Sequence, residues 1–325
     1  DPGYRTGCKM AIIDAQGNVL DYGAYYLTNS EKLKQEAQKK LAEKIRKFNV
    51  TLLSIGNGTA SYETEQFASK MIEEEKLDCH YIITNEAGAS VYSASKLAID
   101  ELPDLDVTIR GAVSIARRVQ DPLAESVKID PKSIGVGQYQ HDVNQKQLTH
   151  TLDQVVESVV NHVGVELNTA SPAILQHIAG ISGTVAKNIV AFRQENGGFT
   201  SRKQLLKVPR LGPAAFTQCA GFLRLNGAKN PLDNTSVHPE SYELAERIIG
   251  ELGFTLKDLQ DKSQLEALQV KLPLVDVDKM AHKLDAGIPT VRDIIAALAK
   301  PGRDPREDLP APLTRKHVVS LEDIK

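Results

Sequence analysis

Carboxylates and glycines gather in three short stretches near the start of this chain. The first is DPGYRTG, in which Asp1 stands directly before a turn that contains Gly3 and Gly7. IGNGTAS (55–61) and TNEAGAS (84–90) each follow a short apolar run that we predict to be a strand. A carboxylate at a strand end, beside backbone that permits close approach, suits either of two chemistries. It can help to hold a divalent cation for hydrolysis, or it can help to grip a phosphate.

A second group of candidate residues lies in a repeat near the middle of the chain. SPAILQHIAGISGTVAKNIVAFR and FTSRKQLLKVPRLGPAAFTQCAGFL each predict a short helix, a tight hairpin and a second helix. We expect the apolar hairpin residues to be buried and the hairpin amides to face outward, where they and the next helix N-terminus can bind an anion. The predicted phosphate-binding residues are Gly180, Ile181, Ser182, Gly183, Lys187, Pro209, Arg210, Leu211 and Gly212.

The charge distribution separates this repeat from its surroundings. The whole chain carries a net charge of −3, so any field that attracts nucleic acid must be local. Residues 171–229 carry +7, whereas residues 233–285 carry −5. One such hairpin is compatible with an ordinary glycine-capped helical pair. Two copies about 29 residues apart in a basic region favour a paired helix–hairpin–helix module that contacts the nucleic-acid backbone.

The elements that must position these residues follow from the hydrophobic pattern. Residues 9–14 and 19–27 predict a β-hairpin, residues 51–58 and 81–84 predict further strands, and residues 31–48 and 64–77 predict helices. This order indicates an α/β domain in which the later strands are parallel. From residue 144 the pattern is helical, and we predict that residues 144–168 form a buried connecting helix.

Composition excludes several classes of protein. The sequence contains no apolar run long enough for a membrane span and no targeting signal, so a cytoplasmic protein that does not contact membranes is expected. Cys8, Cys79 and Cys219 lack paired spacing and are predicted to be reduced and structural. The absence of Trp and a 5% aromatic content argue against a base-stacking sheet.

The sequence also resembles the family of bacterial Tex transcription accessory proteins. The resemblance covers essentially the whole chain and includes DPGYRTG, IGNGTAS, NEAGASVYSAS, residues 133–182, HPESY (238–242) and GIPTVRDIIAAL (287–298). It implies a multidomain fold: an α/β RNase H-like (YqgF) domain, an all-α paired helix–hairpin–helix domain and a further small helical domain. The expected boundaries are 1–143 for the YqgF domain (its first strand missing), 144–168 for the connecting helix, 169–229 for the paired hairpins, 230–300 for the acidic helical domain and 301–325 for a Pro-rich linker toward an absent OB-fold RNA-binding domain.

The resemblance also bears on catalysis. RNase H-like nucleases use three or four carboxylates to hold two Mg²⁺ or Mn²⁺ ions. Asp1 matches the first ligand of the YqgF pattern, and Glu86 and Asp121 are candidates for others. Asn57 and Asn85, however, are amides where this pattern carries acids. We therefore predict a degenerate domain without enzymatic activity, in which Asp1, Glu86 and Asp121 are catalytic remnants. No cofactor is expected, and Mg²⁺ or Mn²⁺ would be needed only by an active site.

The predicted function is that of a monomeric, largely sequence-independent nucleic-acid-binding factor in transcription. Its partners would be RNA or DNA, together with RNA polymerase or the ribosome. Two alternatives remain open: a metal-dependent nuclease or resolvase that acts through Asp1 and Glu86, and a protein-interaction platform. A phosphate loop of the sugar-kinase type fits Asp1, Gly3 and Gly7, but the further loops of such ATPases are missing. Arg117 and Arg118 are predicted to be solvated helix residues, with phosphate contact as the alternative.

Overall fold

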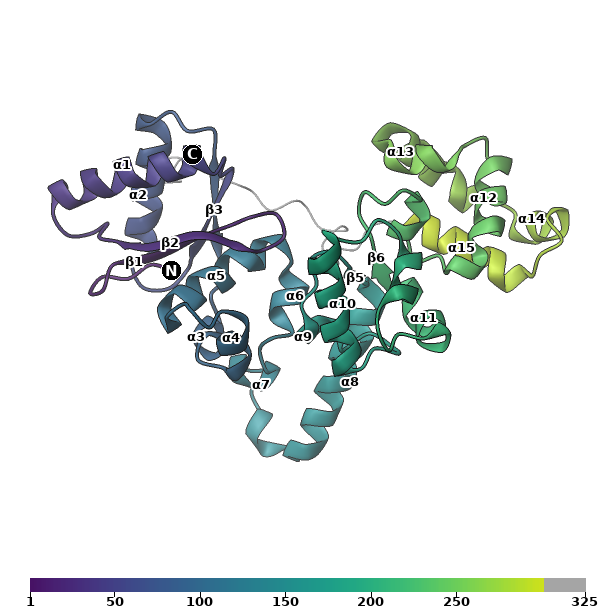
Figure 1. The fold of residues 1–325 in the computed structure, drawn as a ribbon, viewed down its shortest axis with the longest axis horizontal. Coiled ribbons are helices and arrows are strands. Elements are labelled where there is room, and N and C mark those ends of the chain that lie inside the picture. The colour runs from purple at the N-terminus through teal and green to yellow at the C-terminus, as the bar shows by residue number, and fades with distance from the viewer. Residues whose placement is uncertain (301–325) are drawn as a thin grey trace. The chain divides into compact units, whose positions relative to one another are not determined.

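The computed structural model describes residues 1–300, which form two compact units (Figure 1). The first unit comprises Asp1–Asn144, and the second begins at Gln145. The predicted linker at residues 301–325 lies outside the described residues. None of the described helices has the length and apolar character needed to cross a membrane.

The first unit contains two pairs of strands. β1 (Cys8–Ile13) and β2 (Val19–Tyr25) form an antiparallel hairpin, whereas β3 (Leu52–Gly56) and β4 (His80–Thr84) are parallel. The parallel pairing predicted for the strands after the hairpin is therefore confirmed. Because β3 and β4 run in the same direction, the loops IGNGTAS and TNEAGAS emerge at the same edge.

Helices pack on both sides of these strands. The helices of this unit are α1 (Glu31–Lys47), α2 (Ser61–Glu74), α3 (Ala89–Ser93), α4 (Lys96–Glu101), α5 (Val107–Gln120), α6 (Pro122–Ser126), α7 (Pro131–Ile134) and the 3-10 turn η1 (Gln140–Asp142). Figure 1 shows α1 and α2 on one side of the strands and α5 on the other. The second helix begins three residues before the predicted 64–77, because Ala60 adopts a positive φ of 62° and turns the chain directly into α2. It ends early because Lys76 has a φ of 51°.

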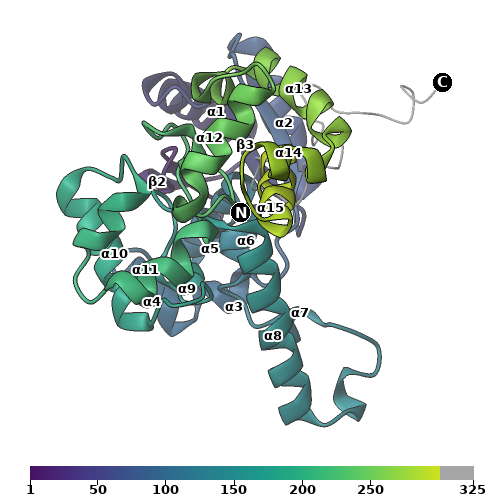
Figure 2. The same cartoon turned by 90° about the vertical axis from the view of Figure 1, so that its right-hand side faces the viewer.

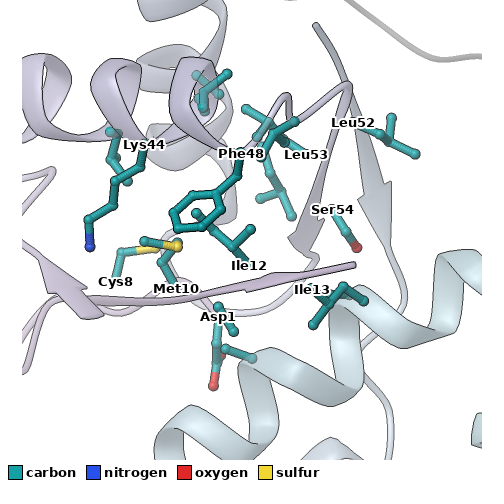
Figure 3. Close-up of a pocket in the computed structure, with 18 of the residues that line it drawn as sticks. Asp1, Cys8, Met10, Ile12, Ile13, Lys44, Phe48, Leu52, Leu53 and Ser54 are labelled. Carbon is teal, nitrogen blue, oxygen red and sulfur yellow. The ribbon is translucent and has the colours of Figure 1, made fainter. Parts of the chain in front are cut away.

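An apolar cavity of about 690 Å³ lies between the two strand pairs. Met10 and Ile12 of β1, Phe48 at the end of α1 and Leu53 of β3 contribute to its lining (Figure 3). Asp1 lies at its margin, where its backbone pairs with that of Lys9 in both directions. Residues of β1 and β3 thus line one cavity beside the DPG turn.

The second unit is almost entirely helical. Its elements are α8 (Gln145–Val163), β5 (Val165–Glu166), α9 (Pro172–Leu175), α10 (Gly183–Asn196), η2 (Arg202–Lys207), α11 (Pro213–Cys219), η3 (Ala220–Phe222), β6 (Leu223–Arg224), η4 (Pro231–Asn234), η5 (Pro239–Ser241), α12 (Tyr242–Glu251), η6 (Leu256–Gln260), α13 (Lys262–Lys271), η7 (Leu272–Leu274), α14 (Val277–Lys283) and α15 (Ile288–Ala299). The short strands β5 and β6 pair in parallel, so the two ends of the repeat meet.

The prediction that the connecting helix is buried is wrong. Of the residues in α8 only Val160 and Val163 are buried, while Val155 and Val159 are 52% and 40% exposed. The N-terminal half of α8 extends away from the other helices of its unit (Figure 2). A regular apolar stripe predicts an amphipathic helix. It does not establish that a partner covers the whole length of that helix.

A buried arginine joins the repeat to the helices that follow it. Arg202, only 1% exposed, donates to the carbonyl oxygens of Leu223 (2.7 Å), Val237 (2.8 Å), Leu232 and Thr235. It also donates to the hydroxyl of Tyr242, which in turn donates to the buried carboxylate of Asp233 at 2.5 Å. This network is continuous with the apolar core formed by Leu232, Val237, Ile248, Ile249, Leu268, Val291 and Ile294.

We predict that Arg202→Met lowers the free energy of unfolding of the second unit by about 3–5 kcal/mol, because buried acceptors lose their charged donor. Hydrogen exchange at the core amides of α12 and α15 would measure the change. Lys203→Met is the matched control, because Lys203 is exposed and its loss should stay within about 0.5 kcal/mol. Equal effects of the two substitutions would contradict the role of Arg202.

Candidate nucleic-acid interface

The first hairpin of the repeat has the geometry of an outward-facing amide loop. Gly180 has a φ of 82°, and Ile181 after it is buried, with 6% exposure. Ser182 caps α10 by accepting the Val185 N–H at 3.3 Å. The amides of Gly183 and Thr184 open the 14-residue helix α10, so they have no intrahelical acceptor. This end of α10 therefore presents donors and the positive end of the helix dipole.

The second hairpin repeats the backbone of the first at an offset of 30 residues. Arg210 occupies the position of Gly180 and has a positive φ of 65°, and Leu211, 3% exposed, matches Ile181. The same turn hydrogen bond recurs, from Ile181 N to Ile178 O and from Leu211 N to Val208 O, each at 3.1 Å. Gly212 thus corresponds to Ser182 as the helix cap, and the equivalence of Gly183 with Gly212 that the motif suggests is off by one residue.

The two hairpins nevertheless differ in what they offer to an anion. Pro213 opens α11 where Gly183 opens α10, so the second copy lacks that amide donor, and α11 is only seven residues long. In exchange, the second hairpin carries an exposed guanidinium on Arg210. A left-handed backbone at a non-glycine residue costs about 1–2 kcal/mol. The first copy therefore offers mainly backbone amides, and the second offers mainly a side-chain charge.

The structure divides the eight basic residues of this region into two sets. Arg193, Arg202 and Arg224 point inward, where Arg193 donates to the carbonyls of Leu167 (3.0 Å) and Ala170 (2.7 Å). Burial lowers the pKa of the Arg193 guanidinium. The exposed set is Lys187, Lys203, Lys207, Arg210 and Lys229. The positive charge available to a ligand is therefore smaller than the sequence count of +7 indicates.

Asn161, near the end of α8, holds the first hairpin and was not among the sequence candidates. Its side-chain amide donates to the carbonyl of His177 at 2.8 Å and accepts the N–H of Ala179 at 3.1 Å. These two bonds fix the chain that leads into Gly180. An asparagine on the polar side of a predicted amphipathic helix gives no periodic signal, so the sequence pattern could not single it out.

In the first unit, the structure brings Asp1 and Glu86 to the same edge. The Glu86 side chain lies over the glycine loop after β3, so that a Cβ built on Gly56 would lie 2.4 Å from its Oε2. The ring of Pro2 approaches the same glycine, and an Asp1 carboxylate oxygen lies 3.2 Å from a Cβ built on Gly111 of α5. Glu86 Oε2 is inaccessible to solvent and has no hydrogen-bond partner among the described residues.

The remaining candidates at this edge have structural contacts. Asn57 Oδ1 accepts the Glu86 N–H at 3.1 Å, and Asn85 Oδ1 accepts the Ala87 N–H at 2.8 Å, so both amides brace the loops. Asp121 caps α6 by accepting the Ala124 N–H at 3.1 Å. Within residues 1–300 no group of three or more His, Cys, Asp or Glu side chains is placed to hold a metal ion. Asp121 is therefore not brought together with Asp1 and Glu86 in such a group.

The prediction that the arginine pair on α5 is freely solvated is wrong. Arg118 donates to the carbonyls of Asn85 and Ala87, each at 2.8 Å, and burial lowers the pKa of its guanidinium. Arg117 donates to the carbonyl of Gly17 at 3.0 Å and lies 3.6 Å from a Glu101 carboxylate oxygen. These arginines hold the loops of the first unit in place.

One structural expectation from the sequence is confirmed. The three cysteines are free and buried, and burial raises the pKa of the Cys219 thiol to about 12. His238 begins the HPESY turn by accepting the Glu240 N–H, and its other ring nitrogen contacts the carbonyl of Thr217 at 2.8 Å. HPESY thus has a structural role, to which Tyr242 adds its contact with Arg202.

Comparison with known families accounts for most of the chain. Residues 1–120 match the Tex protein YqgF-like domain, residues 160–224 match a helix-hairpin-helix motif, and residues 230–306 match an HHH domain. These matches cover the edge with Asp1 and Glu86, the two hairpins and the helices joined to them through Arg202.

Several curated proteins are similar over most or all of the chain. Protein YhgF of Escherichia coli is 52% identical over 100% of this chain and 41% of its own length. The transcriptional accessory protein Tex of Neisseria gonorrhoeae is 51% identical over 94% of this chain and 39% of its own length. The human S1 RNA-binding domain-containing protein 1 is 40% identical over 100% of this chain and 38% of its own length. The chain thus spans about two fifths of the length of these relatives.

Fold and sequence together define a protein with a YqgF-like α/β domain followed by helix–hairpin–helix domains. Proteins named Tex, from Bordetella pertussis and Neisseria gonorrhoeae, share about half of their residues with it across the matched region. The chain belongs to the Tex family.

Because Arg210 has a positive φ, substitutions at this position can test the effect of its backbone conformation apart from the effect of its charge. We predict that Arg210→Gly preserves the hairpin, because glycine adopts this φ without strain, and leaves the free energy of unfolding unchanged or raised by up to about 1 kcal/mol. Arg210→Val should lower it, since a β-branched residue is disfavoured at that φ. Thermal denaturation of the two variants would measure the difference. A Val variant as stable as the Gly variant would contradict the left-handed assignment.

Proposed function

We propose that the paired hairpins bind the sugar–phosphate backbone of nucleic acid without reading its bases. The observation that carries the proposal is the recurrence of one hairpin geometry at Gly180–Gly183 and Arg210–Pro213, with both loop tips exposed. The exposed cations Lys187 and Arg210 belong to the two copies and supply local positive charge on a chain whose net charge is negative. Backbone amides and flexible cations suit phosphate oxygens, which are the same for every base.

A role in transcription rests on the relatives. One is named a transcriptional accessory protein, and another is named for an S1 RNA-binding domain. We propose that this chain supplies the backbone contact of such an accessory protein and that its first unit does not hydrolyse nucleic acid. Three features support the second part: amides at positions 57 and 85, the Glu86 carboxylate folded onto the Gly56–Gly58 loop, and the use of Asp121 as a helix cap.

The hairpin assignment predicts how binding depends on salt. Gly183→Asp places a carboxylate at the anion site, where it also favours the first turn of α10, and Arg210→Glu reverses the charge of the second loop. In fluorescence anisotropy with labelled oligonucleotide duplexes and single strands, the log–log salt slope should become shallower by about one for each phosphate that the variant no longer binds. Because a Cβ on Gly183 would meet only Gln176, at 3.6 Å, the substitution is accommodated.

The outcome of this titration decides the assignment. The double variant Gly183→Asp with Arg210→Glu should bind at least tenfold more weakly than the parent chain, on the order of 1.4 kcal/mol or more. The charge-matched control is Gly250→Asp with Lys257→Glu, on α12 and η6 of the acidic helical region, where both positions are exposed. Undiminished binding by the hairpin variant, or an equal loss of affinity in the control, would remove the hairpins from the interface.

The proposal of a non-hydrolysing first unit predicts no Mn²⁺-dependent cleavage of duplex, branched or single-stranded substrates by residues 1–325. The physical reason is that a two-ion mechanism needs several carboxylates around one position. The assay compares the parent chain with Asp1→Asn and Glu86→Gln at saturating Mn²⁺. Cleavage that depends on Mn²⁺ and disappears in both variants would establish the nuclease alternative instead.

A further inference from the structure

The second helices of the two copies carry side-chain amides at equivalent positions. Asn188 lies in α10 and Gln218 lies in α11, separated by the same 30 residues that relate Gly180 to Arg210. Neither residue belongs to a hairpin. The helix of its own copy therefore sets the position of each residue, and its side chain can reach the hairpin of the other copy.

Asn188 contacts the hairpin of the second copy. Its Nδ2 donates to the carbonyl oxygen of Pro209 at 2.9 Å. That carbonyl belongs to the peptide group between Pro209 and Arg210, so the bond fixes the plane from which Arg210 departs at its positive φ. A side chain on α10 thus constrains the direction in which the second loop presents its guanidinium.

Gln218 packs against the hairpin of the first copy at Gly180, one residue beyond the counterpart of Pro209. A Cβ built on Gly180 would lie 2.9 Å from the Gln218 Cβ and 2.7 Å from its Oε1, and 3.3 Å from the carbonyl oxygen of Ala215. Gly180 therefore lies directly against α11, at a distance that leaves no room for a side chain. The contact again crosses from one copy to the other.

We propose that Asn188 and Gln218 are reciprocal positioning residues, through which the second helix of each copy holds the phosphate-binding hairpin of the other. The inference rests on the proposed function, in that it assigns these two amides to the orientation of the loops that bind phosphate. The two hairpins then form one rigid surface, so a bound nucleic-acid backbone contacts both loops at a fixed separation. Removal of either amide loosens the opposite loop and leaves the loop of its own copy in place.

A crossed set of double-mutant cycles tests this arrangement on the full chain, with labelled duplex and anisotropy as the readout. Asn188→Ala should weaken binding about three- to tenfold, the range for one neutral hydrogen bond. This weakening should vanish in an Arg210→Gly background and persist in a Gly183→Asp background. Gln218→Ala should show the opposite dependence. Gln194→Ala, an exposed amide elsewhere on α10, is the matched control and should change nothing.

Hydrogen exchange without ligand provides a second measurement that does not depend on binding. Asn188→Ala should accelerate exchange at residues 208–212 and leave residues 178–183 unchanged, and Gln218→Ala should do the reverse. Asn188→Asp, nearly isosteric but unable to donate, should behave as Asn188→Ala does, whereas a packing role would leave it like the parent chain. Coupling of each amide to its own hairpin, or uniform acceleration across both, would overturn the reciprocal assignment.

The two proposals fail in different ways. If Gly183→Asp and Arg210→Gly both leave binding unchanged, the hairpins are not the phosphate site, while crossed exchange would still establish the reciprocal contact. If the hairpin variants bind more weakly but the cycles show no crossed coupling, the proposed function stands and the positioning role is wrong.

Discussion

The second unit depends on the burial of one guanidinium. A charged group removed from water is tolerated only when its donors find partners, and Arg202 finds them in backbone carbonyls from residues 223 to 237 and in the Tyr242 hydroxyl. These acceptors come from β6, from η4 and the segment directly after it, and from the start of α12. The second helix–hairpin–helix copy, which η2 opens, therefore cannot reach its native packing independently of the helices beyond residue 230. The basic repeat and the acidic helical region therefore differ in surface charge. Beneath the surface they share the polar network around Arg202.

Hydrogen bonding of this kind also explains why the count of basic residues overestimates the positive charge that a ligand can reach. Arg193 and Arg224 behave as Arg202 does, donating to carbonyls at the joins of the repeat. A count of basic residues cannot distinguish a guanidinium that donates to carbonyl oxygens from one that faces phosphate, because carbonyl and phosphate oxygens accept from the same N–H groups. The lysines of the region are all exposed. A compact ammonium on a flexible stem is less suited than a planar guanidinium to bridging several fixed acceptors in an interior.

Sequence pattern predicted the elements well where period and turn chemistry agreed. The β1–β2 hairpin, α1 and the parallel strands β3 and β4 follow from apolar spacing and flanking turns, and both hairpins follow from an apolar residue between turn-formers. The exact register of the repeat did not follow. Gly183 and Gly212 look equivalent as letters, but the left-handed positions at Gly180 and Arg210 set the true alignment, and an arginine at such a position is not foreseen from residue preference. Nor did the pattern show that much of α8 is exposed in the described part of the chain, since periodicity describes a helix and not its neighbours.

The two units use similar loops in opposite ways. At the edge of β3 and β4 several polar groups are paired within the unit: Asn57 and Asn85 accept loop amides, and Arg118 donates to the carbonyls on either side of Glu86. Glu86 Oε2 and one Arg118 nitrogen, Nη2, are buried without a hydrogen-bond partner among the described residues. A loop held in this way is stable without a ligand, and its carboxylate lies on its own glycines. In the first hairpin the amides of Gly183 and Thr184 face outward at a helix terminus that can offer them no acceptor. Binding an anion there satisfies donors that the fold leaves open, whereas binding at the strand edge must first displace contacts that already exist. The outward-facing amides of α10 therefore support the proposed phosphate contact at the repeat.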